Sequence, residues 1–188
     1  MKKKEKIWSL RIPINLKKSE KSTKEFLKTF EEKLGFVPNI IKTNTIDKKK
    51  FDAFNIFYNR LMQESNFLTK VEKELIAVVV SSINRCWYCC ISHSHALGKL
   101  LKNSKEAKII LINFRNSQIS KKQKIMLDFV TKITEESYLI NADDRNRLRK
   151  AGFSDSQILE IIEVAAFFNM TNRIASGTNM VPNHEYYK

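Results

Sequence analysis

Glycine and proline are scarce in this chain, which has four glycines and three prolines among its 188 residues. No alternation of apolar and polar residues lies between turn signals, so neither a β-sandwich nor a β-barrel is indicated. Uninterrupted apolar runs are also missing, because no segment approaches the roughly 20 residues of a membrane-spanning helix. These shortages predict an all-α protein that does not span a membrane.

Cysteine is rare as well, with three residues in the whole chain. A chain of 188 residues, 43% of them hydrophobic, can bury a core without disulfide staples. We therefore expect a single domain over residues 1–188. Its parts are an N-terminal segment at about 1–65, a cysteine-bearing core at about 66–115 and a second helical half at about 119–180.

The N-terminus, MKKKEKIWSLRIPINLKK, has the basic opening of a signal peptide. However, Arg11 and Pro13 interrupt its apolar part, and no small-residue cleavage site follows. We expect it to belong to the mature chain of a cytoplasmic protein. In that compartment, clustered cysteines are more often catalytic or metal-bound than structural.

The net charge is +14, which favours weak association with any polyanion. The lysines are scattered along every segment, which indicates a compositional habit, and no recognition-helix motif or basic face interleaved with aromatics stands out. We therefore predict neither a specific nucleic-acid partner nor a membrane partner.

Four stretches carry the reciprocal capping pattern of Ser or Thr followed three positions later by Glu or Gln, which marks a helix start. They are Ser22/Glu25, Thr69/Glu72, Ser120/Gln123 and Ser154/Gln157. Later helices are predicted at about 104–113, 120–136, 142–151 and 155–176. Residues 69–85 and 154–173 resemble each other, which indicates an internal pseudo-repeat, although any two amphipathic helices share some of this pattern.

Two helices with an apolar face are predicted in the N-terminal segment. The first helix is expected to stop at Gly35, which adopts the left-handed conformation easily. The next helix carries an aromatic face that we interpret as core. The expected buried positions are Phe26, Leu27, Phe30 and Leu34 in the first helix, and Phe51, Phe54, Tyr58, Leu61 and Met62 in the second.

The segment CWYCCISHSH, residues 86–95, contains all three cysteines and two of the three histidines. In a helix, Cys86, Cys89 and His93 share one face, so Cys89 lies one turn from the imidazole. If one helix ran unbroken over residues 69–101, Glu74 would lie roughly 18 Å before Cys86. A corner at INRC would instead bring Glu74 beside His93 and place the cysteines at a helix start, where the dipole favours a thiolate.

This hairpin predicts a proton relay. Glu74 would orient and charge the imidazole of His93, and His93 would take the thiol proton of Cys89. Cys86 is placed to close a disulfide.

The residues EKELIAVVVSSINRCWYCCISHSHAL resemble the AhpD-like alkylhydroperoxidases of the carboxymuconolactone decarboxylase superfamily. Their signature is a Glu twelve positions before a CxxC and a His four after it, here Glu74, Cys86, Cys89 and His93. The flanking stretches EEKLGFVPNII and FFNMTNRIA resemble the subgroup of uncharacterised peroxidase-related enzymes. Trp87 and Cys90 depart from the small or aliphatic residues usual there, and Tyr88 stands where some members have a second histidine.

The resemblance implies an AhpD-like all-α fold, assembly into homo-oligomers (dimer, trimer or hexamer) and a haem-free peroxidase activity on small-molecule hydroperoxides. Cys89 would attack the peroxide, pass through a sulfenic acid and condense with Cys86. No cofactor is expected beyond this Cys86–Cys89 disulfide. An external thiol, or a lipoylated protein as in the family, would reduce it.

Other interpretations are also compatible with the sequence. Two thiolates and an imidazole suit tetrahedral zinc, with Cys86, Cys89, His93 and His95 as the ligands. A non-redox enzyme on the same fold, or an assembly protein with inert cysteines, is a further alternative. A thioredoxin-like site is not, because its CxxC needs a βαβ context.

Less weight falls on the remaining residues. His184 is expected at the surface or at a subunit contact, and Cys90 is expected to be a small buried hydrophobe pointing away from the site. Asn169, Asn172 and Arg173 could approach the site from the second half or serve helix-end packing.

Overall fold

The computed structural model describes residues 7–16, 19–65 and 67–187, so the basic opening at residues 1–6 lies outside the described residues. Within these ranges the chain forms nine α-helices and no strand, which confirms the all-α prediction. The helices are α1 (Lys21–Leu34), α2 (Asn39–Asn44), α3 (Lys48–Asn59), α4 (Lys70–Ile83), α5 (Trp87–Leu101), α6 (Ser104–Asn113), α7 (Lys121–Glu135), α8 (Ala142–Lys150) and α9 (Asp155–Gly177). A π-helical turn, η2 (Arg60–Glu64), continues α3, and the 3-10 turns are η3 (Phe114–Asn116), η4 (Ser137–Leu139) and η5 (His184–Tyr187).

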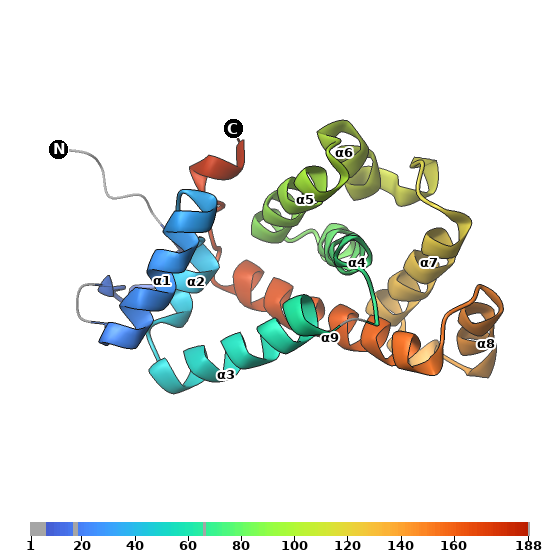
Figure 1. The fold of residues 1–188 in the computed structure, drawn as a ribbon, viewed down its shortest axis with the longest axis horizontal. Coiled ribbons are helices and arrows are strands. Elements are labelled where there is room, and N and C mark those ends of the chain that lie inside the picture. The colour runs from blue at the N-terminus through green and yellow to red at the C-terminus, as the bar shows by residue number, and fades with distance from the viewer. Residues whose placement is uncertain (1–6, 17–18, 66, 188) are drawn as a thin grey trace.

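Helix α4 lies at the centre and packs against α5, α6, α7 and α9 (Figure 1). Its start is fixed by a capping box, in which the Thr69 hydroxyl accepts from the Glu72 N–H and the Glu72 carboxylate accepts from the Thr69 N–H. Every side chain from Leu75 to Val80 is buried. A helix that is apolar on all sides needs neighbours all round, and the surrounding helices supply them.

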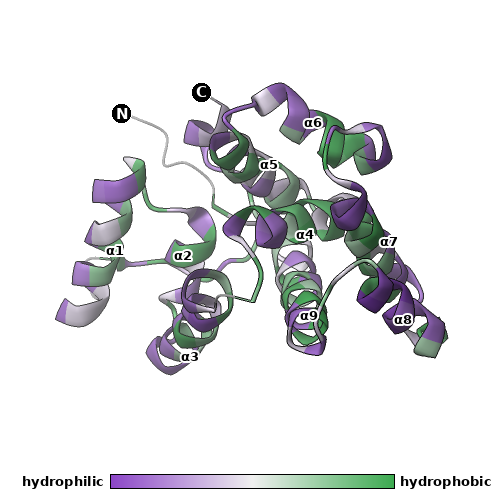
Figure 2. Cartoon of the chain, turned by 45° about the vertical axis from the view of Figure 1, so that its right-hand side comes forward, coloured by the Kyte–Doolittle hydropathy of each residue, from purple (hydrophilic) through white to green (hydrophobic). Residues whose placement is uncertain are grey.

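Helices α1, α2 and α3 form the end of the molecule on the left of Figure 1, where the C-terminal segment also returns. Hydrophobic residues gather on α4 and on the inner side of α9, whereas α8 is largely hydrophilic (Figure 2). None of the helices in the described part of the chain is both long and apolar enough to cross a membrane.

The capping boxes at Thr69, Ser120 and Ser154 are confirmed. The predicted box at Ser22 is wrong, because the N-cap of α1 lies two residues earlier, at Glu20, which makes no side-chain cap bond. Ser22 is therefore already helical. A fourth box at Asn141, with Asp144 as its partner, escapes prediction because an Asn/Asp pair lies outside the Ser/Thr and Glu/Gln pattern. The two helices of the predicted pseudo-repeat, α4 and α9, pack directly on each other, while the repeat itself stays a prediction.

The two apolar faces expected before α4 are only partly core. Helix α1 stops at Gly35 (φ +80°) as predicted, but Leu34 is 43% exposed and Leu27 is the buried member of its apolar set. Phe51, Leu61 and Met62 are buried as predicted. Four aromatic side chains, Phe26, Phe30, Phe54 and Tyr58, instead line a cavity beside α5.

A buried ion pair fastens η2 to α4 and α9. Lys73 and Glu160 have side chains only 1% and 2% exposed, with Lys73 Nζ 3.3 Å from Glu160 Oε1. Lys73 also donates to the carbonyls of Leu61 (2.8 Å) and Ser65 (2.7 Å), while Glu160 Oε2 accepts from the Leu68 N–H (2.6 Å). The interpretation of the lysines as a compositional habit is wrong for Lys73, because this residue neutralises a buried carboxylate and satisfies two backbone carbonyls.

Candidate active site

The predicted corner at INRC is confirmed. Helix α4 ends at Ile83, Arg85 takes a left-handed conformation (φ 51°), and Cys86 is the N-cap of α5. Helices α4 and α5 therefore form an antiparallel pair, the most extensive helix contact of the described chain. The cysteines open the second helix, where unpaired backbone N–H groups point toward incoming negative charge.

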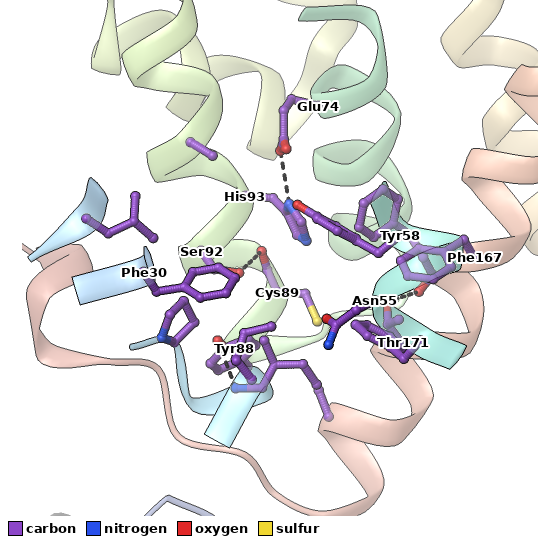
Figure 3. A pocket seen from close by; sticks show the side chains of 18 of the residues that line it. Phe30, Asn55, Tyr58, Glu74, Tyr88, Cys89, Ser92, His93, Phe167 and Thr171 are labelled. Atoms are coloured by element: carbon purple, nitrogen blue, oxygen red, sulfur yellow. Dashed lines mark hydrogen bonds and ion pairs between the residues drawn. The ribbon is translucent and has the colours of Figure 1, made fainter. Parts of the chain in front are cut away.

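The hairpin brings Glu74 and His93 together. Glu74 Oε2 lies 3.0 Å from His93 Nδ1, and the two side chains are 13% and 19% exposed. The edge-on ring of Phe168, 4.6 Å away between centroids, fixes the plane of the imidazole. With Nδ1 engaged by the carboxylate, Nε2 is left for proton exchange. In Figure 3, His93 lies between Glu74 and the part of the cavity that holds Cys89.

Cys86 and Cys89 are paired as a disulfide, with Cα atoms 5.3 Å apart. Cys86 is fully buried, and its sulfur accepts from the Cys89 backbone N–H at the helix start (3.4 Å). Cys89 is 4% exposed and lines the cavity, which Cys86 does not. Since Cys89 and His93 are four residues apart on α5, the sulfur that faces the cavity is one turn from the imidazole.

The cavity has a volume of about 270 Å³ and lies between the N-terminal helices, α5, α9 and the C-terminal segment (Figure 3). Tyr88 reaches it from α5, and its hydroxyl accepts from the Ile40 N–H (3.3 Å). Burial raises the pKa of Tyr88 to about 12, so it stays neutral over the physiological range. The remaining aromatic lining comes from Phe26, Phe30, Phe54, Tyr58, Phe167, Phe168 and Tyr186.

The C-terminal segment contributes to the cavity in a way that the sequence does not indicate. His184 is exposed, as predicted, but Tyr186 two residues later turns inward. Its ring lies 6.3 Å from Tyr88 and 5.1 Å from Phe36, measured between centroids. No local pattern marks Tyr186, because its position depends on where the chain end packs.

The four residues of the alternative zinc site do not come together. His95 packs against Tyr186, with 5.5 Å between ring centroids, and burial together with nearby Lys99 lowers its pKa. Among the residues that the structure describes, no three His, Cys, Asp or Glu side chains are grouped to hold a metal ion.

Asn169, Asn172 and Arg173 of α9 serve the corner and do not line the cavity, whereas Thr171 of the same helix does. Asn84, at the end of α4, donates to the side chains of Asn169 (3.0 Å) and Asn172 (3.1 Å). Arg173 is exposed and donates to the carbonyl and side chain of Asn169. These three residues of α9 therefore have the packing role that the sequence left as one of two alternatives.

Cys90 is the free cysteine. Its thiol donates to the Ser81 carbonyl (3.3 Å) and does not line the cavity, as predicted, but the residue is half-buried and not the buried hydrophobe that the sequence predicts. Trp87 beside it is 52% exposed. Burial raises the pKa of Cys90 from an ordinary 9.0 to about 11.

We expect Cys90 to react slowly with iodoacetamide. Burial disfavours the charged form and so raises the pKa of this thiol by about two units. The thiolate fraction at pH 8 is therefore about a hundredfold lower than that of an ordinary cysteine. Peptide mass spectrometry after timed alkylation of the oxidised protein, in which Cys90 is the remaining thiol, measures the rate. Alkylation as fast as that of free cysteine would contradict this expectation, and denatured protein serves as the control.

Known proteins resemble this chain in sequence and in fold. The sequence pattern of the carboxymuconolactone decarboxylase family matches residues 50–125. A crystal structure of an uncharacterized peroxidase-related protein from Silicibacter sp. TM1040 is 40% identical in sequence, with a TM-score of 0.94 over 100% of this chain and 97% of that one. The chain belongs to the carboxymuconolactone decarboxylase family.

Within the family the likeness is to its AhpD-like members. An uncharacterized peroxidase-related protein from Ralstonia eutropha JMP134, described as an alkylhydroperoxidase AhpD core, is 32% identical, with a TM-score of 0.92 over 98% of this chain and 96% of that one. The debrominase Bmp8 shares the fold at 19% identity, with a TM-score of 0.76 over 89% of each chain. No curated protein sequence matches the chain.

Proposed function

We propose that this protein is a haem-free, thiol-dependent hydroperoxide reductase. The observation that carries the proposal is the Glu74–His93 pair (3.0 Å) set one helical turn from Cys89, the cysteine that faces the cavity. A carboxylate that holds an imidazole, which in turn serves a thiol, is the arrangement that activates a nucleophilic cysteine. Membership of a family with AhpD-like relatives supports the same conclusion.

In the first half-reaction, His93 accepts the thiol proton of Cys89 at Nε2, and Glu74 stabilises the imidazolium that results. The Cys89 thiolate attacks the terminal oxygen of the hydroperoxide, a sulfur–oxygen bond forms, and the oxygen–oxygen bond breaks. The alkoxide leaves with the proton held by His93. Cys89 is now a sulfenic acid, and the hydroperoxide has been reduced to the alcohol.

In the second step, the sulfur of Cys86 attacks the sulfenic acid sulfur of Cys89, a sulfur–sulfur bond forms and the sulfur–oxygen bond breaks. The departing hydroxide takes up the proton that the Cys86 thiol gave up, so water leaves and the disulfide results. The N-cap position stabilises Cys86 as a thiolate for this attack, because the N–H of Cys89 already points at its sulfur. Burial of Cys86 away from the cavity keeps it from competing for the peroxide.

Return to the dithiol requires two electrons from one external dithiol or from two molecules of a small thiol, which are oxidised by exchange with the disulfide. A small thiol or a lipoylated protein would supply them. We further propose that the protein works in the cytoplasm as a homo-oligomer and needs no cofactor besides its own cysteine pair.

The test is stopped-flow mixing of the reduced protein with cumene hydroperoxide, followed by mass spectrometry of the peptide that spans residues 86–90. We expect a fast, saturable phase, formation of one cumyl alcohol per protein and a Cys86–Cys89 disulfide. The variant H93Q should slow the phase by roughly 10² to 10⁴, the usual contribution of a general base. A reaction no faster than that of free cysteine at the same pH would overturn the proposed function.

A further inference from the structure

The described lining of the cavity lacks lysine and arginine side chains, although the protein is strongly basic. The chain has 34 Lys and Arg residues, yet none of them is among the described residues that line the cavity. The one carboxylate among those lining residues, Glu74, is paired with His93. A ligand anion that entered would lose its hydration, find no Lys or Arg to pair with and lie near Glu74, which already occupies His93, at a cost of several kcal/mol.

The volume indicates a ligand of moderate size. A dry apolar cavity of about 150 Å³ holds one benzene ring. The present cavity, at about 270 Å³, has room for one ring with substituents and is walled mainly by aromatic and aliphatic side chains. Hydrogen peroxide would leave most of this apolar surface uncovered and would gain little from it.

Tyr186 forms one wall of this space and is held there by the C-terminal segment. Asn183 accepts from the Asn39 N–H (2.7 Å) and donates to the Val37 carbonyl (3.1 Å), while Asn39 donates to the Val181 carbonyl (2.8 Å). These bonds fasten the segment to the N-terminal part of the chain. Met180 anchors the segment from the other side, packed with the disulfide and Tyr88.

We propose that the cavity selects uncharged organic hydroperoxides of about one ring, and that Tyr186 is the specificity-determining residue that sets their size. The proposal rests on the proposed function for its chemistry. It adds a substrate class and a residue outside the Cys/His/Glu relay. Because Tyr186 packs against Tyr88 and has no part in the Glu74–His93–Cys89 relay, its loss should change which substrates fit and leave the sulfur chemistry intact.

The experiment compares second-order rate constants of the reduced protein at 0.15 M salt for three hydroperoxides: cumene hydroperoxide, its para-carboxylate and its para-phenyl derivative. Each rate is divided by that of free cysteine to remove intrinsic reactivity. We expect cumene hydroperoxide to exceed the carboxylate by at least about tenfold. Y186A should raise the rate of the two-ring substrate relative to cumene hydroperoxide by about tenfold, since it removes the wall.

Y187A is the matched control, because Tyr187 lies in the same turn but is 58% exposed and does not line the cavity. It should leave every ratio unchanged. Y186L, which keeps apolar bulk, provides a second variant if Y186A unfolds. Equal normalised rates for the neutral and carboxylated substrates, or a size ratio that Y186A and Y186L leave unchanged, would overturn the inference while the proposed function stands.

If no hydroperoxide reacts faster with the reduced protein than with free cysteine, the proposed function fails. Binding measurements then test the selectivity of the cavity on its own. Ligand-observed NMR with cumyl alcohol and its para-carboxylate should then show binding of the neutral compound alone, weakened by Y186A and not by Y187A. Equal binding of both compounds, or of neither, would refute the selectivity as well.

Discussion

Replacement of Cys89 by serine should abolish the fast reaction with cumene hydroperoxide. Cys89 is the cysteine that lines the cavity, and it lies one turn from His93. The thiols left in C89S are Cys86, fully buried, and Cys90, which bonds to Ser81 away from the cavity. Neither can meet a bound peroxide, so we expect the rate to fall by at least about a hundredfold, to the level of an ordinary thiol. Stopped-flow measurement of peroxide consumption tests this.

Two matched variants separate the roles of the cysteines. In C86S the serine hydroxyl can still cap α5, so the fold is kept. Cys89 should then react once at nearly the parent rate and stop as a sulfenic acid, which dimedone traps for mass spectrometry. C90S should behave as the parent protein. Consumption of peroxide by C89S at the parent rate would contradict the assignment of Cys89 as the attacking residue.

The variant K73M should be far less stable than the parent protein. Glu160 is 2% exposed, and without Lys73 it becomes a buried, uncompensated carboxylate, while the carbonyls of Leu61 and Ser65 lose their donor. Breaking such a pair costs about 3–5 kcal/mol. For a chain of this length that lowers Tm by roughly 6–20 °C. Calorimetry or circular dichroism measures the shift.

The control is K70M, in which an exposed lysine of the same helix turn is replaced by the same residue. It should change Tm by no more than a degree or two, since surface changes are usually within about 0.5 kcal/mol. The double variant K73M/E160Q removes the uncompensated charge and should recover part of the loss. Equal Tm values for K73M and K70M would show that the buried pair contributes no net stability.

The Lys73–Glu160 pair also affects the cavity of the candidate active site. Lys73 holds the carbonyls of Leu61 and Ser65, at the end of the arm formed by α3 and η2. That arm carries Phe54 and Tyr58 into the cavity. Loosening it should therefore weaken substrate binding more than it alters the reaction of Cys89, because Glu74, His93 and Cys89 lie on the separate α4–α5 hairpin.

Spacing along the sequence is enough to predict the hairpin. The capping box at Thr69 fixes the start of α4, and the distances of Glu74 and His93 from the INRC corner bring them side by side once the chain reverses. Such inference works because helix geometry is regular, so residue number converts directly into position and face. The same regularity locates α6 to α9, whereas it misses the short α2, which has no cap pattern, and misplaces the start of α1.

Only the tertiary structure decided what surrounds that hairpin. Phe54 and Tyr58 have the spacing of core residues, but they line a cavity because α3 packs at a distance from α5 that leaves the space between them open. Tyr186 and the Lys73–Glu160 pair join residues far apart in the chain. Their positions follow from how whole helices pack. The sequence alone thus determined the local reactive geometry, while the shape, charge and closure of the cavity depend on long-range packing, which no local spacing encodes.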